Sequence, residues 1–450
     1  MIHKFTRNNI FIVLDVNSGA IHMVDKMVYD LLDHYPEADK SESIKALKST
    51  YDEVELSKAI DEIQDLIDTE QLYSDDTYIK NLEFKNRKPV IKAMCLHIAH
   101  DCDLRCKYCF ASQGDFQGTR SMMSEDIGKK ALKFLVDSSG NRRNLEVDFF
   151  GGEPLMNFDV VKSLVTYGRS IEKEHNKNFR FTLTTNGVKL TDEIIDYVNE
   201  HMDNVVLSLD GDKEVNDNMR VTINNKGSYD TIVPKFQKLV EKRKDKSYYI
   251  RGTFTKFNRE FAKDVIHMSD LGFFSTSVEP VVTEAKYPYA LSEEDLPIIC
   301  EQYDLLADAY LERHGTEKAF AFFHFNVDLS QGPCIVKRLS GCGAGSEYVA
   351  VTPEGDIYPC HQFVGDEKFK LGNVAEDNYN NHLGHEFKEA HVYNKEKCKT
   401  CWAKFYCSGG CHANAYNFNH DINVPYDLGC EMEKKRLEAA FYIQAKLAEV

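Results

Sequence analysis

The sequence predicts an α/β fold in which a parallel sheet curls into a partial (β/α)6, TIM-like barrel. Six apolar runs of strand length alternate with amphipathic helical patterns between about residues 90 and 282. Strands that alternate with helices along a chain form parallel sheets, either open or curled. The expected strands lie near 91–99, 145–150, 179–185, 204–209, 248–254 and 275–282.

Helical patterns fill the gaps between these strands, and two of them begin with recognisable caps. Ser124 and Thr191 each precede two acidic residues, so a side-chain oxygen caps the helix while carboxylates oppose its dipole. Active groups in such folds lie at the C-terminal ends of the strands. The helices are expected near 124–137, 157–175, 191–201, 228–243 and 258–271.

Residues 1–85 are expected to form a separate, winged-helix-like domain. Apolar runs at 9–14 and 20–24 flank a turn with Asn17 and Gly19, which predicts a β-hairpin. Two interpretations stay open: a sheet edge that captures a peptide strand, or a domain that only packs on the rest. Helices are expected at about 26–35, 41–50 and 55–69.

Composition restricts the ligands and the compartment. The chain has 55 Lys and Arg against 72 Asp and Glu, a net charge of −17, which is unlike a general nucleic-acid binder. No apolar run approaches the roughly 20 residues needed to span a bilayer, and the first residues lack a signal-peptide layout. We therefore expect a cytoplasmic protein without membrane or nucleic-acid partners.

Thirteen cysteines are concentrated in two places, which favours metal or cluster ligation over disulfides in a reducing compartment. The barrel is expected over 86–300, a bridging segment over 301–333, and a cysteine-rich domain over 334–450. Helices near 293–313 and 431–448 bound this last part. Cys95 and Cys300 match no motif, and we interpret them as core thiols.

The first group is Cys102, Cys106 and Cys109, directly after the first expected barrel strand. Three thiolates hold three irons of a [4Fe–4S] cube and leave the fourth iron open to another ligand. A zinc site completed by a distant histidine is the alternative.

This spacing, with Tyr108 before the last cysteine, resembles the signature of radical S-adenosylmethionine (SAM) enzymes. In that family the open iron binds the amine and carboxylate of SAM. One electron from the cluster then cleaves SAM to a 5′-deoxyadenosyl radical. The resemblance makes the three cysteines catalytic as well as metal ligands.

Further residues match this family at the ends of the next strands. Glu153, in a Gly-Gly-Glu-Pro turn, is expected to accept a hydrogen bond from the SAM ammonium, and the glycines permit close approach of a ligand. For Arg220 the alternative is a surface arginine, and Glu279 is either at the core rim or in the pocket. By similarity, the residues that bind SAM are Tyr108, Gly151, Gly152, Glu153, Asn186, Ser208 and Arg220.

A second group of seven cysteines resembles the SPASM extension of radical SAM enzymes, which holds two auxiliary iron–sulfur clusters. Its Cys-x2-Cys unit also occurs in zinc ribbons, which are the alternative. By analogy with the family, Cys398, Cys401, Cys407 and Cys430 hold one auxiliary cluster, and Cys342, Cys360 and Cys411 hold the other.

Three [4Fe–4S] clusters have twelve irons, and SAM occupies one, so eleven protein ligands would saturate them. The motifs supply ten. Either Cys334 is the eleventh ligand, or the last iron is open to a substrate thiolate. A thiolate on iron is deprotonated and oriented, which suits sulfur chemistry.

His361 departs from one branch of the family. In anaerobic sulfatase-maturating enzymes an acidic residue that acts as a base follows the second cysteine of the extension, whereas His361 follows Cys360 here. The histidine either moves a proton near neutral pH or hydrogen-bonds to a cluster sulfur. Sulfatase maturation is therefore not favoured.

The three-part layout of the whole chain resembles the six-cysteine (SCIFF) peptide maturases. The resemblance implies a ribosomally made, cysteine-rich precursor peptide whose leader binds the N-terminal domain. It implies an intramolecular thioether from cysteine sulfur to an acceptor α-carbon, threonine by analogy, and a flavodoxin or ferredoxin as electron donor. Alternatives are carbon–carbon crosslinking, formylglycine formation, or a non-catalytic electron carrier or peptide adaptor.

Overall fold

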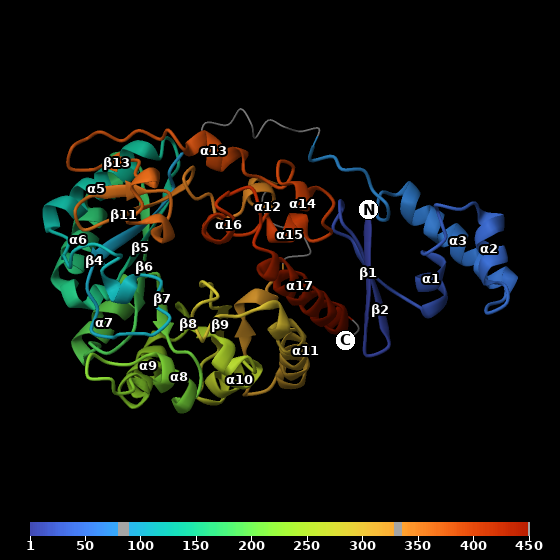
Figure 1. Cartoon of the computed structure of the whole chain (residues 1–450), viewed down its shortest axis with the longest axis horizontal. Coiled ribbons are helices and arrows are strands. Elements are labelled where there is room, and N and C mark those ends of the chain that lie inside the picture. The colour runs from blue at the N-terminus through green and yellow to red at the C-terminus, as the bar shows by residue number, and fades with distance from the viewer. Residues whose placement is uncertain (80–89, 328–334, 449–450) are drawn as a thin grey trace.

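The computed structural model describes residues 1–79, 90–327 and 335–448. Figure 1 shows three parts: an N-terminal sheet with its helices, a central sheet wrapped by helices, and a loop-rich C-terminal part above it. The long helix α17 (Asp427–Ala448) runs between the N-terminal sheet and the rest of the molecule.

The central sheet confirms the predicted α/β fold with a partial barrel. Within the described ranges its ten strands lie in the order β10-β9-β8-β7-β6-β5-β4-β11-β12-β13, and the six predicted strands, β4 to β9, are parallel neighbours in chain order. The strands are β4 (Ala93–Ala99), β5 (Asn144–Gly151), β6 (Asn178–Thr185), β7 (Asn204–Ser208), β8 (Ser247–Phe254), β9 (Ser275–Pro280), β10 (Ala321–Phe322), β11 (Tyr348–Val351), β12 (Asp356–Tyr358) and β13 (Gly372–Asn373).

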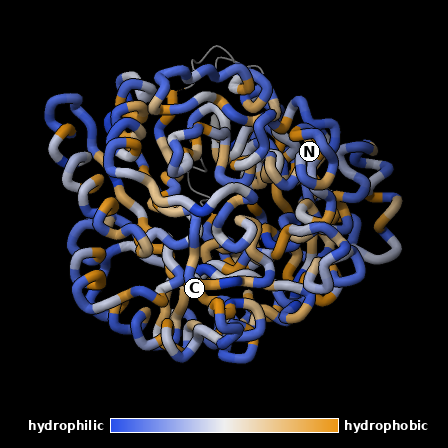
Figure 2. Tube along the Cα trace, turned by 60° about the vertical axis from the view of Figure 1, so that its left-hand side comes forward, coloured by the Kyte–Doolittle hydropathy of each residue, from blue (hydrophilic) through white to orange (hydrophobic). Residues whose placement is uncertain are grey.

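Helices cover the outer face of this sheet, and all of them except α8 (Lys213–Met219) lie at the predicted places. Ser124 and Thr191 cap their helices as expected, accepting hydrogen bonds from Ile127 N and Ile194 N. Figure 2 shows hydrophilic residues prevailing around the outline of the molecule. The helices are α5 (Glu125–Ser138), α6 (Phe158–His175), α7 (Asp192–His201), α8 (Lys213–Met219), α9 (Tyr229–Arg243), α10 (Ala262–Asp270) and α11 (Leu296–Arg313).

Alternation along the strands divides core residues from barrel-lining residues. On β4, Met94, Leu96 and Ile98 belong to the large hydrophobic core with residues of α5 and α6. Cys95 and His97 lie between them in sequence and therefore face the interior of the barrel. Each parallel strand thus supplies one face to the core and the other to the site.

The C-terminal part consists of short helices and loops around the second cysteine group. No helix in the three described ranges is long and apolar enough to cross a membrane. The helices of this part are α12 (Ile335–Ser340), α13 (Gly384–Glu389), α14 (Glu396–Lys399), α15 (Lys404–Cys407), α16 (His412–Asn419) and α17.

The N-terminal part contains the predicted hairpin and three helices, and also a strand that we did not predict. Strand β1 (Ile2–Arg7) pairs with β2, so the sheet order is β1-β2-β3. The sequence of this strand is mostly polar and gives no strand pattern, and only Phe5 on it is buried. The other elements are β2 (Ile10–Asp15), β3 (Ile21–Val24), α1 (Lys26–Leu31), α2 (Lys40–Leu47) and α3 (Glu53–Asp68).

This sheet docks on α17 and on the cysteine-rich part. The ring of His3 stacks on Trp402 with centroids 3.8 Å apart, and its Nε2 lies 3.0 Å from Glu438. The Arg7 guanidinium lies 2.8 Å from Asp308 and over the ring of Tyr442. The domain is therefore held against the rest of the molecule by aromatic and charged contacts.

We expect Arg7→Met to loosen this docking. Loss of the charge-assisted contacts costs about 1–3 kcal/mol, which corresponds to roughly tenfold or faster amide exchange in β1 with no change in β6. Hydrogen exchange followed by mass spectrometry measures both. The control is Lys4→Met on the same strand, because Lys4 pairs with the exposed Asp33 within the domain. Equal acceleration in both variants would contradict the docking role.

Candidate active site and cysteine clusters

The first three cysteines lie in a loop after β4 that is fastened to the segment after α8. Leu104 forms a β-bridge with Thr222. The backbone N–H groups of Arg105 and Lys107 donate to Val221 O and Met219 O at 2.6 and 3.0 Å. The cysteine loop is therefore held at the C-terminal ends of the strands, as predicted.

A buried cluster of polar side chains holds this loop in place. The Tyr108 hydroxyl donates to the carboxylate of Asp210 at 2.6 Å and accepts a hydrogen bond from Arg220 Nη1 at 2.9 Å. Arg220 is only 8% exposed, which excludes a surface arginine. Burial raises the pKa of Asp210, and the hydrogen bonds and the guanidinium oppose this shift. Tyr108 and Arg220, which sequence similarity assigned to SAM binding, therefore hydrogen-bond to other side chains of the protein in this structure.

Gly151 and Gly152 permit a close crossing of two backbone segments. A Cβ on Gly151, where φ is +124°, would lie 2.3 Å from Ala99 O. A Cβ on Gly152 would lie 2.2 Å from Asp101 O. Any larger residue would push the end of β5 away from the cysteine loop.

Glu153 and Asn186 join the ends of β5 and β6 to the same loop. The fully buried Glu153 carboxylate accepts hydrogen bonds from Leu155 N, Thr185 Oγ1 and Asn186 N at 2.8 to 3.0 Å. Burial and the nearby Asp103 raise the pKa of Glu153 to about 7. Asn186 Nδ2 donates to Asp103 at 2.8 Å and lies 3.5 Å from Cys102 Sγ. Ser208, at the end of β7, is half-buried.

The donor chemistry of this loop fits an iron–sulfur cluster. Burial raises the pKa of the Cys106 thiol to about 11 and raises that of Cys102 further. Bound iron supplies the positive charge that deprotonates such thiols. Within the described residues no group of three His, Cys, Asp or Glu is placed to hold a single metal ion. A cubane has a different requirement, because each thiolate binds its own iron.

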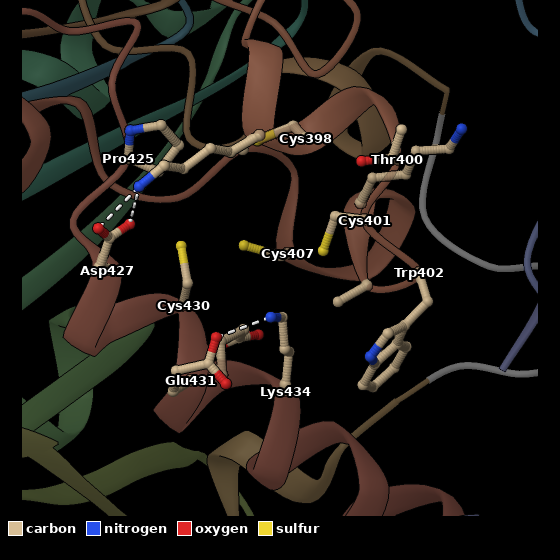
Figure 3. A pocket seen from close by; sticks show the side chains of 15 residues that line it. Cys398, Thr400, Cys401, Trp402, Cys407, Pro425, Asp427, Cys430, Glu431 and Lys434 are labelled. Carbon is tan, nitrogen blue, oxygen red and sulfur yellow. Dashed lines mark hydrogen bonds and ion pairs between the residues drawn. The ribbon is translucent and has the colours of Figure 1, made fainter. Parts of the chain in front are cut away.

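Four cysteines of the second group line one cavity of about 550 Å³. In Figure 3 the sulfurs of Cys401, Cys407 and Cys430 point into this space, with Cys398 at its upper edge. They come from α14, α15, the turn between these helices, and α17. The set that the family resemblance assigned to one auxiliary cluster therefore lies together.

The other set is Cys342, Cys360 and Cys411. Cys360 is buried after β12, whereas Cys342 and Cys411 are exposed. Burial raises the pKa of Cys360, and the charges of Cys411 and Cys342 act in the same direction, so the three thiols are neighbours. Cys334 lies outside the described residues.

His361 is enclosed by aromatic residues at the barrel interior. Its ring lies 5.4 and 5.3 Å from the rings of Phe110 and Phe150, and the Tyr348 hydroxyl is 3.3 Å from its Nδ1. Burial, with a contribution from Arg251, lowers the pKa of His361 to about 4. The imidazole is therefore neutral, and a weak base, near pH 7.

Sequence patterns did not single out most of the polar residues that line the barrel. Asp148 on β5 accepts a hydrogen bond from Thr184, and burial raises its pKa to about 7. Arg251 on β8 is exposed. Glu279, which we left between core rim and pocket, pairs with the buried His324 at 2.9 Å. Strand alternation is the signal that finds them, once the core face of each strand is known.

Two family models match separate parts of the chain. The model of the radical SAM superfamily matches residues 96–268. The model of the SPASM iron–sulfur cluster-binding domain matches residues 342–402. The chain therefore contains a radical SAM domain followed by a SPASM domain.

Particular relatives extend over most of the chain. A cysteine-type anaerobic sulfatase-maturating enzyme of Clostridium novyi is 26% identical over 371 residues, covering 77% of this chain and 96% of the relative. The mycofactocin maturase MftC of Mycolicibacterium smegmatis is 25% identical over 361 residues, covering 71% and 78%.

Solved structures show the same fold. The structure titled native anSMEcpe with bound AdoMet matches with a TM-score of 0.66 and 20% identity, covering 79% of this chain and 99% of that one. Streptococcus suis SuiB bound to S-adenosylmethionine matches with a TM-score of 0.56 and 18% identity, covering 93% and 97%. The likeness to SuiB therefore includes more of the chain.

We expect Tyr108→Phe to weaken the cysteine loop, because Asp210 and Arg220 lose their shared buried partner, at a cost of about 1–3 kcal/mol. After anaerobic reconstitution, the variant should hold less iron at the first cluster, seen as a smaller SAM-sensitive electron paramagnetic resonance (EPR) signal. Tyr248→Phe is the control, since its hydroxyl accepts from Phe274 N at the opposite end of the sheet. A full signal in Tyr108→Phe would refute the locking role.

Proposed function

We propose that this chain is a radical SAM maturase that forms an intramolecular thioether in a ribosomally made, cysteine-rich precursor peptide. The finer assignment follows its resemblance to SCIFF maturases such as the thioether-forming maturase CteB. The observation that carries the proposal is the docked N-terminal sheet beside a core with two separate cysteine groups. This arrangement joins a peptide-binding edge to a centre for radical chemistry.

The predicted ligands divide into three sets, each for one [4Fe–4S] cluster. Cys102, Cys106 and Cys109 hold the first, with Asn186, Ser208 and Arg220 toward SAM. When bound and reduced by one electron, SAM supplies a 5′-deoxyadenosyl radical that removes a hydrogen atom from carbon. The auxiliary sets are Cys398, Cys401, Cys407 and Cys430, and Cys342, Cys360 and Cys411.

The N-terminal domain is proposed to bind the leader. Among the described residues β3 pairs only with β2, so its outer edge is open to strand addition. Met23 on this strand is 41% exposed, which provides an apolar contact beside that edge. The contacts of His3 and Arg7 then fix the bound leader relative to the barrel.

The barrel interior is proposed to hold the segment that reacts. Joining sulfur to an α-carbon removes two hydrogens from the peptide, one as a hydrogen atom and one as a proton with an electron. His361, neutral and surrounded by Phe110 and Phe150, shapes the pocket more than it moves a proton at pH 7. The proposed redox partner is a flavodoxin or ferredoxin.

Formylglycine formation in a sulfatase is the second candidate, and the Clostridium novyi relative favours it. Experiments also distinguish the thioether proposal from a carbon–carbon crosslink and from a non-catalytic role as an electron carrier. An aldehyde reacts with a hydrazide probe, and a thioether consumes one alkylatable thiol. A carbon–carbon crosslink leaves every thiol free, and a carrier or adaptor consumes no SAM.

For the first test, we expect anaerobically reconstituted protein to hold about twelve irons per chain and to release 5′-deoxyadenosine with dithionite and SAM. With a cysteine-rich precursor, the product should be lighter by two hydrogens and have one fewer alkylatable thiol. Mass spectrometry before and after iodoacetamide measures both. An unchanged peptide alongside active SAM cleavage would remove the thioether proposal.

For the second test, we expect the triple change of Cys102, Cys106 and Cys109 to Ala to abolish SAM cleavage and leave about eight irons. The loss follows because no other described thiols lie in that loop. Cys300→Ala is the control, since this half-buried helical thiol belongs to none of the three sets. A comparable loss of iron in Cys300→Ala would show that the predicted ligand sets are wrong.

A further inference from the structure

A buried lysine lies within the second cysteine group. Lys395 is fully buried, directly before α14. Its Nζ donates a hydrogen bond to Gly409 O at 2.8 Å. Burying an ammonium costs several kcal/mol unless negative charge lies close to it, and one carbonyl does not offset that cost.

The carbonyl that Lys395 holds belongs to the loop that joins the two auxiliary sets. Ser408, Gly409 and Gly410 have φ values of +61°, +86° and +74°. This tight loop links Cys407, assigned to one set, to Cys411, assigned to the other. Burial lowers the pKa of Lys395, whereas negative charge on the nearby Cys398, Cys407, Cys411 and Cys430 raises it.

Neighbouring lysines differ from Lys395 in having carboxylate partners. Lys397 pairs with Asp427 at 2.6 Å, and Lys434 pairs with Glu431 at 2.7 Å, both near the surface. The partly buried Asp76 lies 3.4 Å from Lys404. Across the described ranges, Lys395 makes no ion pair with a carboxylate. The negative charge that fits it is that of thiolate-ligated iron.

We propose that Lys395 sets the reduction potential of the auxiliary clusters, as a buried positive charge shared by both cysteine sets. This inference rests on the iron–sulfur content of the proposed function. Each reduction adds one negative charge to a cluster, and a nearby cation in a low-dielectric region stabilises the reduced form. The lysine therefore raises the potentials, whereas its bond to Gly409 positions the loop.

Three variants separate the effect of the Lys395 charge from that of its hydrogen bond to Gly409 O. Lys395→Gln keeps a donor for Gly409 O and removes the charge, Lys395→Met removes both, and Lys395→Arg keeps the charge. The control is Lys397→Gln, two residues along the chain. It removes the same charge, but from a lysine whose side chain is 57% exposed. Solvent and salt screen that position strongly.

EPR-monitored redox titration of the reconstituted holoenzyme measures the potentials. The EPR signal that changes on adding SAM belongs to the first cluster, so it is left out when the potentials of the auxiliary clusters are determined. We expect Lys395→Gln and Lys395→Met to weaken auxiliary reduction about tenfold or more, a downward shift of about 59 mV for one electron. Lys395→Arg and Lys397→Gln should stay close to the wild-type protein, and SAM cleavage without peptide should be unchanged.

Other outcomes have definite meanings. Wild-type potentials in Lys395→Gln would overturn the proposal. Lys395 would then only position the loop through its hydrogen bond to Gly409 O. Loss of auxiliary iron in the Gln and Met variants but not in Arg would overturn the proposal, because the charge would then serve to hold the clusters and not to set their potential. Equal loss in all three overturns it. Absence of auxiliary clusters from the wild-type protein would instead refute the proposed function.

Discussion

The open end of the barrel depends on one close crossing of backbone, where Gly151 and Gly152 lie against Ala99 and Asp101. This contact fixes the end of β5 beside the cysteine loop. Glu153, the next residue, then reaches the backbone of Asn186, and Asn186 reaches Asp103. The ends of β4, β5 and β6 are thereby joined. A reactive centre needs this order, because small errors in placement cost large factors in rate.

Helix α17 has a comparable role for the molecule as a whole. It packs along α11, contributes to the large core through residues such as Phe441 and Ile443, and provides the surface on which the N-terminal sheet docks. It also begins beside the four-cysteine cavity, where Cys430 lies. One element therefore connects the barrel, the cysteine-rich part and the N-terminal domain.

Much of this arrangement follows from sequence, because periodicity and cysteine spacing are local signals. The six strands, their helices and the caps at Ser124 and Thr191 lie where the patterns place them. Strand β1 was missed, since the partners of its polar residues His3 and Arg7 come from distant segments, such as Glu438 and Tyr442 on α17. The burial of Arg220 and Lys395 was equally invisible, because it depends on which distant segments surround each side chain.

The stacking of His3 on Trp402 has an optical consequence. Trp402 is the only tryptophan of the chain, and it follows Cys401 in the wall of the four-cysteine cavity. An indole in that position is close to any iron–sulfur chromophore in the cavity and is covered by a ring from the N-terminal domain. Its emission therefore reports, without any label, both the filling of the cavity and the seating of the domain on it.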